Sequence, residues 1–292
     1  MPKKYLVEAH SLKFQHLVST EFRYKRYASE FVEKNKRIAV KPIKQAVISP
    51  SVMMLLYPLE GEIPDYPRNQ FLDDVCDEVE KDIRNWFAIG AIRVSIDFTE
   101  GRLANKNDAR NPWTGKNTLQ EFIDLNNRVL DRFSANERRN IGIHTCPGGD
   151  CDSVHSKEVP YVLLLERMFL INAGYFLIQC ASEGDKVAVY KLCGQYSRED
   201  ANDVPQVCFI GVINPLNPTV ETPKQVRDAL LTAAKHIPPN RLGATDDCGF
   251  SPFSSDLKPK HGGSPDFARD IAMRKIVARI EGAKLASLEL GI

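Results

Sequence analysis

The chain has 292 residues, of which 43% are hydrophobic and 26% are charged, and its formal net charge is +1 at pH 7. A chain of this length and composition buries a full core, which excludes intrinsic disorder and fits one large α/β domain or two small ones. The small net charge gives no reason to expect a nucleic-acid or membrane-surface partner.

The sequence begins Met-Pro-Lys-Lys-Tyr-Leu-Val-Glu, without the apolar segment of a signal peptide. No later run is long enough and sufficiently free of charge to span a bilayer. The seven cysteines are an odd number in a chain without such a signal, which favours reduced thiols over a disulfide framework. We therefore expect a soluble, cytoplasmic protein.

Short apolar runs alternate with amphipathic segments along most of the chain. The runs predict strands over residues 44–50, 91–97, 140–144, 174–180, 207–212 and 241–245. Apolar residues at helical spacing predict helices over 69–89, 119–132, 161–172 and 222–236. Thr222-Pro223 and Ser264-Pro265 each place a capping residue before a proline at the first helical position. Strand and helix in regular turn predict parallel β/α units.

Polar and sulfur-bearing side chains stand at the C-terminal ends of the predicted strands. In a β/α fold these ends converge on one site, so the convergence itself predicts chemistry there. The sequence has no glycine-rich nucleotide fingerprint and no P-loop lysine that would compete with this prediction. The residues concerned are Asp97, His144, Cys146, Gln179, Cys180 and Cys248.

His144, Cys146 and Cys248 are candidate metal ligands. Side chains alternate along a strand, so His144 and Cys146 lie on the same face and can reach one ion. One imidazole and two thiolates form a zinc donor set, and three protein ligands with an open fourth position are the catalytic form. A cysteine at a strand end can equally be a small buried hydrophobic residue. The spacing alone leaves both interpretations open.

The polar segment after Cys146 offers an alternative metal set. Cys151 and His155 could join Cys146, although that set competes with ligands distributed over separate strands. Gly148 and Gly149 in the same segment permit close backbone approach to a ligand, but such a loop is more often a simple connection.

Four segments, in their order along the chain, resemble the catalytic barrel of cobalamin-independent methionine synthase and its relatives. They are residues 95–100, the His144-x-Cys146 strand, the loop 211–222 and residues 237–250. The resemblance implies a TIM-like (β/α)₈ barrel that holds one zinc ion, Zn²⁺, and activates a substrate thiol for attack on an alkyl donor. We expect residues 39–292 to form this barrel, with 1–38 as an N-terminal extension or a remnant of the first barrel units.

The resemblance also implies roles for particular residues. His144, Cys146 and Cys248 match the zinc ligands of the family. Asp97 matches the carboxylate that holds the amino group of an amino-acid substrate such as homocysteine, and we expect Glu100 to help orient that substrate. A methyl-folate is the implied alkyl donor. From the sequence alone, Asp97 could equally be a solvated strand cap.

The chain departs from the family pattern in three places. Gln179 stands where methionine synthases have a further glutamate ligand, which leaves Gln179, Cys180 or Glu183 as candidates for that position. Leu216 stands where the synthases have a histidine that acts as an acid, and a leucine cannot move protons, so the methyl donor either needs no such assistance or is not a folate. Only six strands are predicted, whereas the family barrel has eight. We expect an open barrel, a shortened paralogue, or a barrel completed by a partner chain or a second copy.

Two further functions are compatible with these departures. One is another zinc-dependent thiol reaction, such as the thiol addition to an epoxide carried out by epoxyalkane–coenzyme M transferases. The other is a non-catalytic zinc-binding module that retained the metal site and lost substrate binding. The response of the metal to an added thiol distinguishes the second from an enzyme.

Overall fold

The fold is that of a computed structural model, which describes residues 21–37, 39–58, 61–108, 114–147, 156–199, 203–250 and 264–292. Six parallel strands form a single sheet in the order of the sequence. All six predicted strands are confirmed. Their bounds are β1 (Lys44–Ile48), β2 (Arg93–Asp97), β3 (Ile141–Thr145), β4 (Tyr175–Ile178), β5 (Val207–Ile213) and β6 (Leu242–Asp246).

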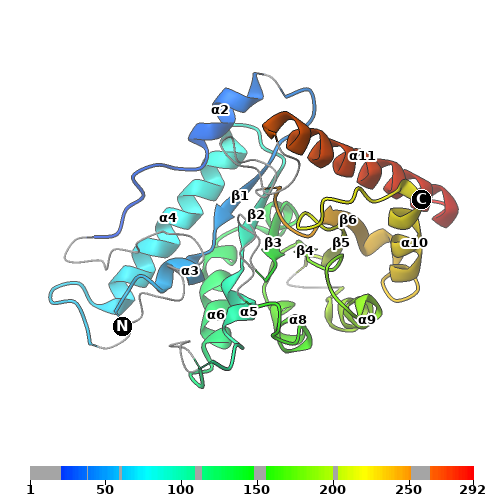
Figure 1. Cartoon of the computed structure of the whole chain (residues 1–292). Helices are drawn as coiled ribbons and strands as arrows, with labels where there is room; N and C mark the ends of the chain where they lie inside the picture. The colour runs from blue at the N-terminus through cyan, green and yellow to red at the C-terminus, as the bar shows by residue number, and fades with distance from the viewer. Residues whose placement is uncertain are drawn as a thin grey trace.

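Helices follow the strands and cover the outer face of the curved sheet (Figure 1). The four predicted helices correspond to α4 (Arg68–Ala88), α6 (Thr118–Leu130), α8 (Val162–Met168) and α10 (Pro223–Ala233). The remaining described helices are α2 (Glu30–Lys36), α3 (Pro50–Met54), α5 (Glu100–Leu103), α7 (Ala135–Arg138), α9 (Lys186–Tyr196), the 3₁₀ turn η3 (Pro239–Arg241) and α11 (Pro265–Leu290).

Both predicted helix starts occur as capped N-termini. The side chain of Thr222 accepts a hydrogen bond from the backbone N–H of Gln225, and the side chain of Gln225 accepts one from the backbone N–H of Thr222, which completes a capping box. Ser264 accepts a hydrogen bond from the N–H of Phe267 at the start of α11. No described helix is both long and apolar enough to cross a membrane.

The outward-facing side chains of the strands form the core with the helices. Ile96, Ile143 and Phe176 are fully buried and belong to the same hydrophobic cluster as Phe71 and Trp86 of α4. Because successive strand residues point to opposite faces, the polar residues between these positions face the interior of the barrel. The packing of the outer face thus decides which side chains reach the interior.

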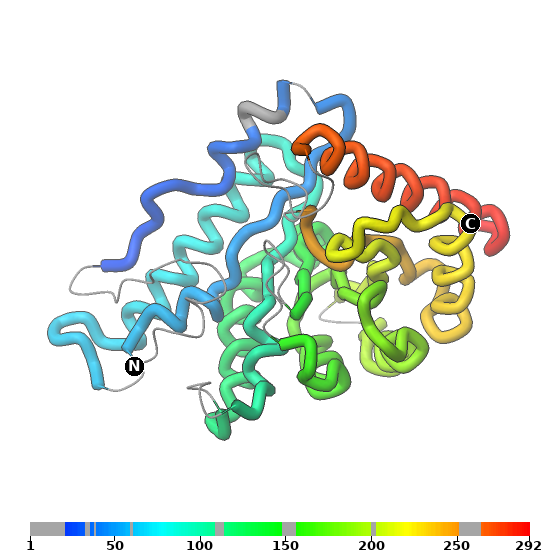
Figure 2. Tube along the Cα trace, viewed as in Figure 1, coloured from blue at the N-terminus to red at the C-terminus, as the bar shows by residue number. Residues whose placement is uncertain are grey.

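The strand order is that of a singly wound TIM-like barrel, which confirms the predicted α/β fold class. Among the described residues β1 pairs only with β2, and β6 only with β5, so the sheet is open between its first and last strands. Helix α11 packs against α10 and β6 beside this opening; Figure 2 shows it in red next to the yellow helix α10. The prediction of six rather than eight strands holds for the described chain.

The predicted N-terminal segment, residues 1–38, is described only in part. Residues 1–20 lie outside the described residues. The described portion packs on α4, where the hydroxyl of Tyr27 donates a hydrogen bond to Glu78 over 2.6 Å.

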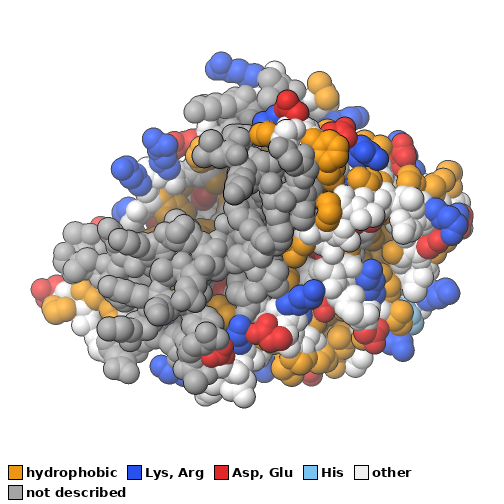
Figure 3. All heavy atoms as spheres, in the orientation of Figure 1, with side chains coloured by type: hydrophobic (Ala, Val, Ile, Leu, Met, Phe, Trp, Pro, Cys, Tyr) orange, Lys and Arg blue, Asp and Glu red, His pale blue; other side chains and the backbone are white. Residues whose placement is uncertain are grey.

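Basic and acidic side chains are interspersed over the described part of the face in Figure 3, in keeping with the small net charge.

A glycine on β3 makes room for an aromatic ring inside the barrel. A Cβ atom added to Gly142 would lie 2.1 Å from the ring of Tyr175, whose hydroxyl donates a hydrogen bond to the carbonyl of Val94 over 2.6 Å. Since this bond ties the ring to β2, the ring cannot simply rotate away. The close approach therefore requires glycine at this position.

Replacing Gly142 with alanine should lower the free energy of unfolding by about 1–3 kcal/mol, because the methyl group overpacks the ring. Urea denaturation of the variant measures this. Gly184→Ala is the matched control, since nothing lies within 4 Å of a Cβ atom added there. Equal midpoints for the two variants would contradict the packing described for Tyr175.

Candidate metal centre

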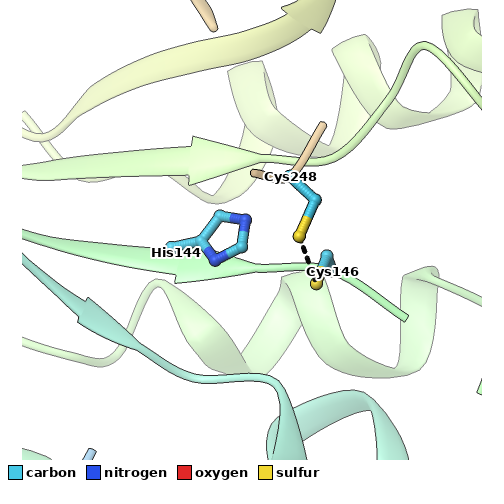
Figure 4. Close-up of side chains that lie close together, drawn as sticks. All are labelled: His144, Cys146 and Cys248. Carbon is cyan, nitrogen blue, oxygen red and sulfur yellow. Dashed lines mark hydrogen bonds between the residues drawn. The ribbon is translucent and has the colours of Figure 1, made fainter. Parts of the chain in front are cut away.

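The structure brings His144, Cys146 and Cys248 together at the C-terminal ends of β3 and β6 (Figure 4). Their ligand atoms all lie within 4.8 Å of one another, and the two sulfur atoms are 3.7 Å apart. Two sulfurs at about 2.3 Å from a tetrahedral zinc ion would be about 3.8 Å apart. The donor set and its spacing therefore fit a zinc ion held by three protein ligands.

His144 is oriented by a carboxylate. Its Nδ1 atom lies 2.6 Å from Oδ1 of Asp97, and its Nε2 atom lies 3.2 Å from the carbonyl oxygen of Asp247. Burial lowers the pKa of His144, but the hydrogen bond and negative charge of Asp97 outweigh it and raise the pKa to about 9. A carboxylate on Nδ1 fixes the tautomer that presents Nε2 to a metal, where the ion would replace the Nε2 proton.

The thiol of Cys146 donates a hydrogen bond to the sulfur of Cys248. The hydrogen bond from Cys146 lowers the pKa of Cys248 to about 7 against the opposing effect of burial, and the charge of His144 acts in the same direction. Cys146 is almost fully buried, whereas Cys248 is partly exposed. Because the thiolate is the form that binds metals, the lowered pKa of Cys248 favours its action as a ligand near neutral pH.

Asp247 fixes the backbone that carries Cys248. Its buried carboxylate accepts hydrogen bonds from the backbone N–H groups of Cys180, Ala181 and Ser182, at 2.7–2.8 Å. Gly211 permits this, since a Cβ atom there would lie 2.0 Å from the carboxylate. Sequence reasoning missed Asp247, although an acidic residue directly before a candidate ligand was a visible signal.

The three candidates for a further ligand lie in different surroundings. Gln179 accepts a hydrogen bond from Arg102 and donates to Ser182 and Glu183. Glu183 also forms an ion pair with Arg102, at 2.7 Å. Among the described residues, only His144, Cys146 and Cys248 form the cluster with metal-ligand spacing. Glu183 is thus held by the buried Arg102 outside that cluster, whereas Gln179 is held by Arg102 and also lines the small cavity beside Cys146 and Cys248.

Cys180 is turned away from the metal centre. It is fully buried in the core on the outer face of the sheet, where burial strongly raises the pKa of its thiol and Tyr190 is its hydrogen-bonding neighbour. Its inclusion among the candidate ligands is therefore corrected, because strand alternation places Cys180 and Gln179 on opposite faces. The alternative ligands Cys151 and His155 lie outside the described residues.

Asp97 and Glu100 occupy different environments although they are close in sequence. The Asp97 side chain is 47% exposed and contacts His144, so it lies at the open side of the site. Glu100 is 3% exposed and accepts hydrogen bonds from the hydroxyls of Ser49 and Ser51. Asn126 donates a further hydrogen bond to Ser51 over 2.7 Å. Glu100 is thus part of a buried polar network beneath the strand ends.

The loop after β5 lies over the two cysteines. Asn214, Pro215 and Leu216 line a small cavity together with Cys146 and Cys248. Leu216 is therefore beside the metal centre. The family resemblance implies a histidine that acts as an acid at this position, but this chain has the apolar leucine there. This loop can exclude water from the sulfur atoms but cannot supply a proton from Leu216.

A fully buried lysine of α11 holds this loop in place. Nζ of Lys275 donates to the carbonyls of Asn214 and Thr219 and to the carboxylate of Glu221, at 2.6–3.2 Å. Glu221 in turn accepts the backbone N–H of Asn214 over 3.0 Å. A buried ammonium group requires such partners, so the long C-terminal helix and the loop form one unit.

The buried carboxyl of Glu100 makes the stability of the protein depend on pH. Burial raises its pKa from 4.5 to about 7, although the serine hydroxyls oppose the shift. A carboxyl whose pKa is higher in the folded than in the unfolded state contributes its full stabilisation of the fold at a pH below its unfolded pKa. For Glu100 this contribution is lost as the pH rises through about 7.

Replacing Glu100 with glutamine removes this ionisation. The free energy of unfolding of the variant minus that of the wild type should therefore increase by about 2–3 kcal/mol from pH 5 to pH 8. Urea denaturation at both pH values measures the difference, with the exposed Glu62→Gln as control. A difference from the wild type that is the same at both pH values would show that Glu100 is already ionised in the folded state.

Comparisons with known proteins bear on this fold. No family model and no curated protein matches the chain. A solved B12-independent methionine synthase from Shewanella sp. W3-18-1, in complex with selenomethionine, superposes with a TM-score of 0.66 at 16% identity, over 92% of this chain and 69% of that one. A candidate vitamin B12-independent methionine synthase from Listeria monocytogenes gives a TM-score of 0.56 at 16% identity, over 89% and 72%. The chain thus shares the fold of B12-independent methionine synthases over most of its length, as the sequence resemblance implied.

Proposed function

We propose that this chain is a zinc-dependent alkyl transferase that activates a small thiol. The observation that carries the proposal is the cluster of His144, Cys146 and Cys248 at the strand ends, with sulfur atoms 3.7 Å apart and three ligands of the catalytic type. The likeness of the fold to methionine synthases supports the same class of reaction.

Bound zinc would supply a cation that removes the proton of a substrate thiol and holds its sulfur in place. The protein residues determine where that substrate lies. Asp97 keeps the imidazole of His144 in position and leaves half of its own side chain exposed on the open side of the site. A carboxylate at this point suits the ammonium group of an amino-acid thiol such as homocysteine.

The transfer itself requires few groups from the protein. The thiolate sulfur forms a bond to the alkyl carbon of the donor, and the leaving group departs with the electron pair of the broken bond. Leu216 and Pro215 line the cavity beside the sulfur atoms and keep water from them. Since Leu216 cannot donate a proton, the donor must release a leaving group that needs none from this position. The family resemblance suggests a methyl-folate, but its leaving nitrogen must gain a proton, so a donor other than folate fits this loop better.

Metal analysis tests the first part of the proposal. Purified, reduced protein should hold one zinc ion per chain, and Cys248→Ser should bind it at least about tenfold more weakly because a thiolate ligand is lost. Cys193→Ser is the matched control, since Cys193 is buried in the core away from the cluster. Zinc content and competition with a chromogenic chelator give the result. Equal affinities for the two variants would contradict the assignment.

Cobalt substitution then tests whether the site accepts a thiol. Adding homocysteine to the cobalt protein should change the visible absorption if its sulfur enters the open position. An unchanged spectrum in protein that binds cobalt at His144, Cys146 and Cys248 would favour the non-catalytic zinc-binding module.

A further inference from the structure

A cavity of about 800 Å³ lies between the inner face of the sheet and helix α11. This volume falls within the range of small-molecule sites, roughly 300–1,000 Å³. Its walls include Lys44 and Arg93 at the N-terminal ends of β1 and β2, and Arg279 and Lys284 of α11. None of the metal ligands and none of the residues of the loop after β5 line it. The cavity is therefore separate from the metal centre.

Arg93 is held in this cavity by two aromatic rings. Its guanidinium lies 5.3 Å from the ring centre of Tyr175 and 5.4 Å from that of Phe209, and the two rings pack edge to face 5.8 Å apart. The hydroxyl of Tyr175 donates a hydrogen bond to the carbonyl of Val94, which fixes the position of the Tyr175 ring. Cation–π contacts of this kind orient a guanidinium and leave its N–H groups available.

The described residues provide no partner for those N–H groups. Among the described residues, no hydrogen bond or ion pair involves the Arg93 guanidinium, whereas the guanidinium of Arg102 donates to the side chains of Gln179 and Glu183 and to two backbone carbonyls. The Arg93 side chain is half-buried, and it is not among the described buried side chains with an unpaired polar atom. Its five donors lie in one plane, which suits a carboxylate or phosphate that reaches them from solution.

The charged side chains that line the cavity have one sign. The cavity is lined by Lys44, Arg93, Arg279 and Lys284, and no described acidic residue lines it. Arg279 is neutralised by an ion pair with Asp246 on β6, whereas Lys44 donates only to the hydroxyl of Ser95, over 3.0 Å. A cavity with apolar walls and charged side chains of one sign attracts ions of the opposite sign and raises their local concentration.

The remaining walls are apolar. Besides the two rings they include Leu177 and Ala244 from the sheet and Ile280 and Leu288 from α11. An inorganic ion would leave this surface in contact with water, whereas an organic anion can cover it. We propose that the cavity binds an organic anion, a carboxylate or phosphate ester, with its head group on Arg93 and its apolar body between the two rings and α11.

Two related fluorescent probes test the proposal on the intact chain. 8-Anilinonaphthalene-1-sulfonate carries an anionic group, and N-phenyl-1-naphthylamine has the same ring system without it. The variants are Arg93→Met, which keeps an apolar stem, and Arg26→Met, which removes an exposed arginine outside the cavity. Lys284→Met is a second cavity variant at an exposed position, where folding is not affected by the loss of a buried group.

Arg93→Met should weaken binding of the sulfonate probe about tenfold or more, and Lys284→Met should weaken it by a smaller factor. Binding of the uncharged probe should change less than about twofold, because the apolar walls remain. The proposal is overturned if wild-type protein does not bind the sulfonate probe. It is also overturned if Arg93→Met and Arg26→Met bind it equally, or if both probes weaken together, which would indicate an apolar patch without an anion site.

Displacement distinguishes the head groups. Hexanoate, hexyl phosphate and hexanol are titrated against the bound sulfonate probe, and each has the same apolar chain. Displacement by either anion at concentrations at least about tenfold below those needed for hexanol supports the site and identifies the preferred head group. Displacement by hexanol at the same concentrations as by the anions contradicts it. Because no metal ligand lines the cavity, these results are independent of zinc binding.

Discussion

The carboxylate of Asp247 is the interaction on which the geometry of the metal centre depends. It joins the end of β6 to the loop after β4 by accepting hydrogen bonds from three backbone N–H groups. The backbone carbonyl oxygen of Asp247 lies 3.2 Å from Nε2 of His144. Burial raises the pKa of Asp247, and the three N–H groups oppose that shift by stabilising its charge. The neighbouring residue, Cys248, is thereby held opposite Cys146, although the two are 102 positions apart in the chain.

Helix α11 has a second structural role beside the opening between β1 and β6. Lys275 anchors the loop that covers the cysteines, and Arg279 one turn further on pairs with Asp246 at the end of β6. Further along the same helix, Lys284 and Leu288 form one wall of the cationic cavity. One helix thus supports the metal centre at its N-terminal part and the proposed anion site at its C-terminal part.

The sequence predicted those features that depend on local pattern. Apolar runs located all six described strands, capping residues located the starts of α10 and α11, and strand alternation placed His144 and Cys146 on one face. Helix α9 was not predicted, because its apolar residues do not form a clear stripe.

Features that depend on distant partners could not be read from the sequence. Arg102 meets Gln179 and Glu183 from 77 and 81 positions away, and Lys275 meets Glu221 from 54 positions away. Glu100 shows the same limit, since its proximity to Asp97 suggested a place at the open site, whereas the serines after β1 bury it. Strand alternation places Cys180 and Gln179 on opposite faces of the sheet, but only the packing of the helices on the outer face shows that Cys180 is the one turned away from the metal centre.

We propose that His144, Cys146 and Cys248 share one zinc ion with an open position for a thiol. X-ray absorption at the zinc edge measures the ligands directly, before and after homocysteine is added. We expect two sulfur ligands at about 2.3 Å and one imidazole nitrogen in the protein alone, and a third sulfur ligand once homocysteine is bound. A zinc ion with oxygen and nitrogen ligands only, or a sulfur count unchanged by saturating homocysteine, would contradict it.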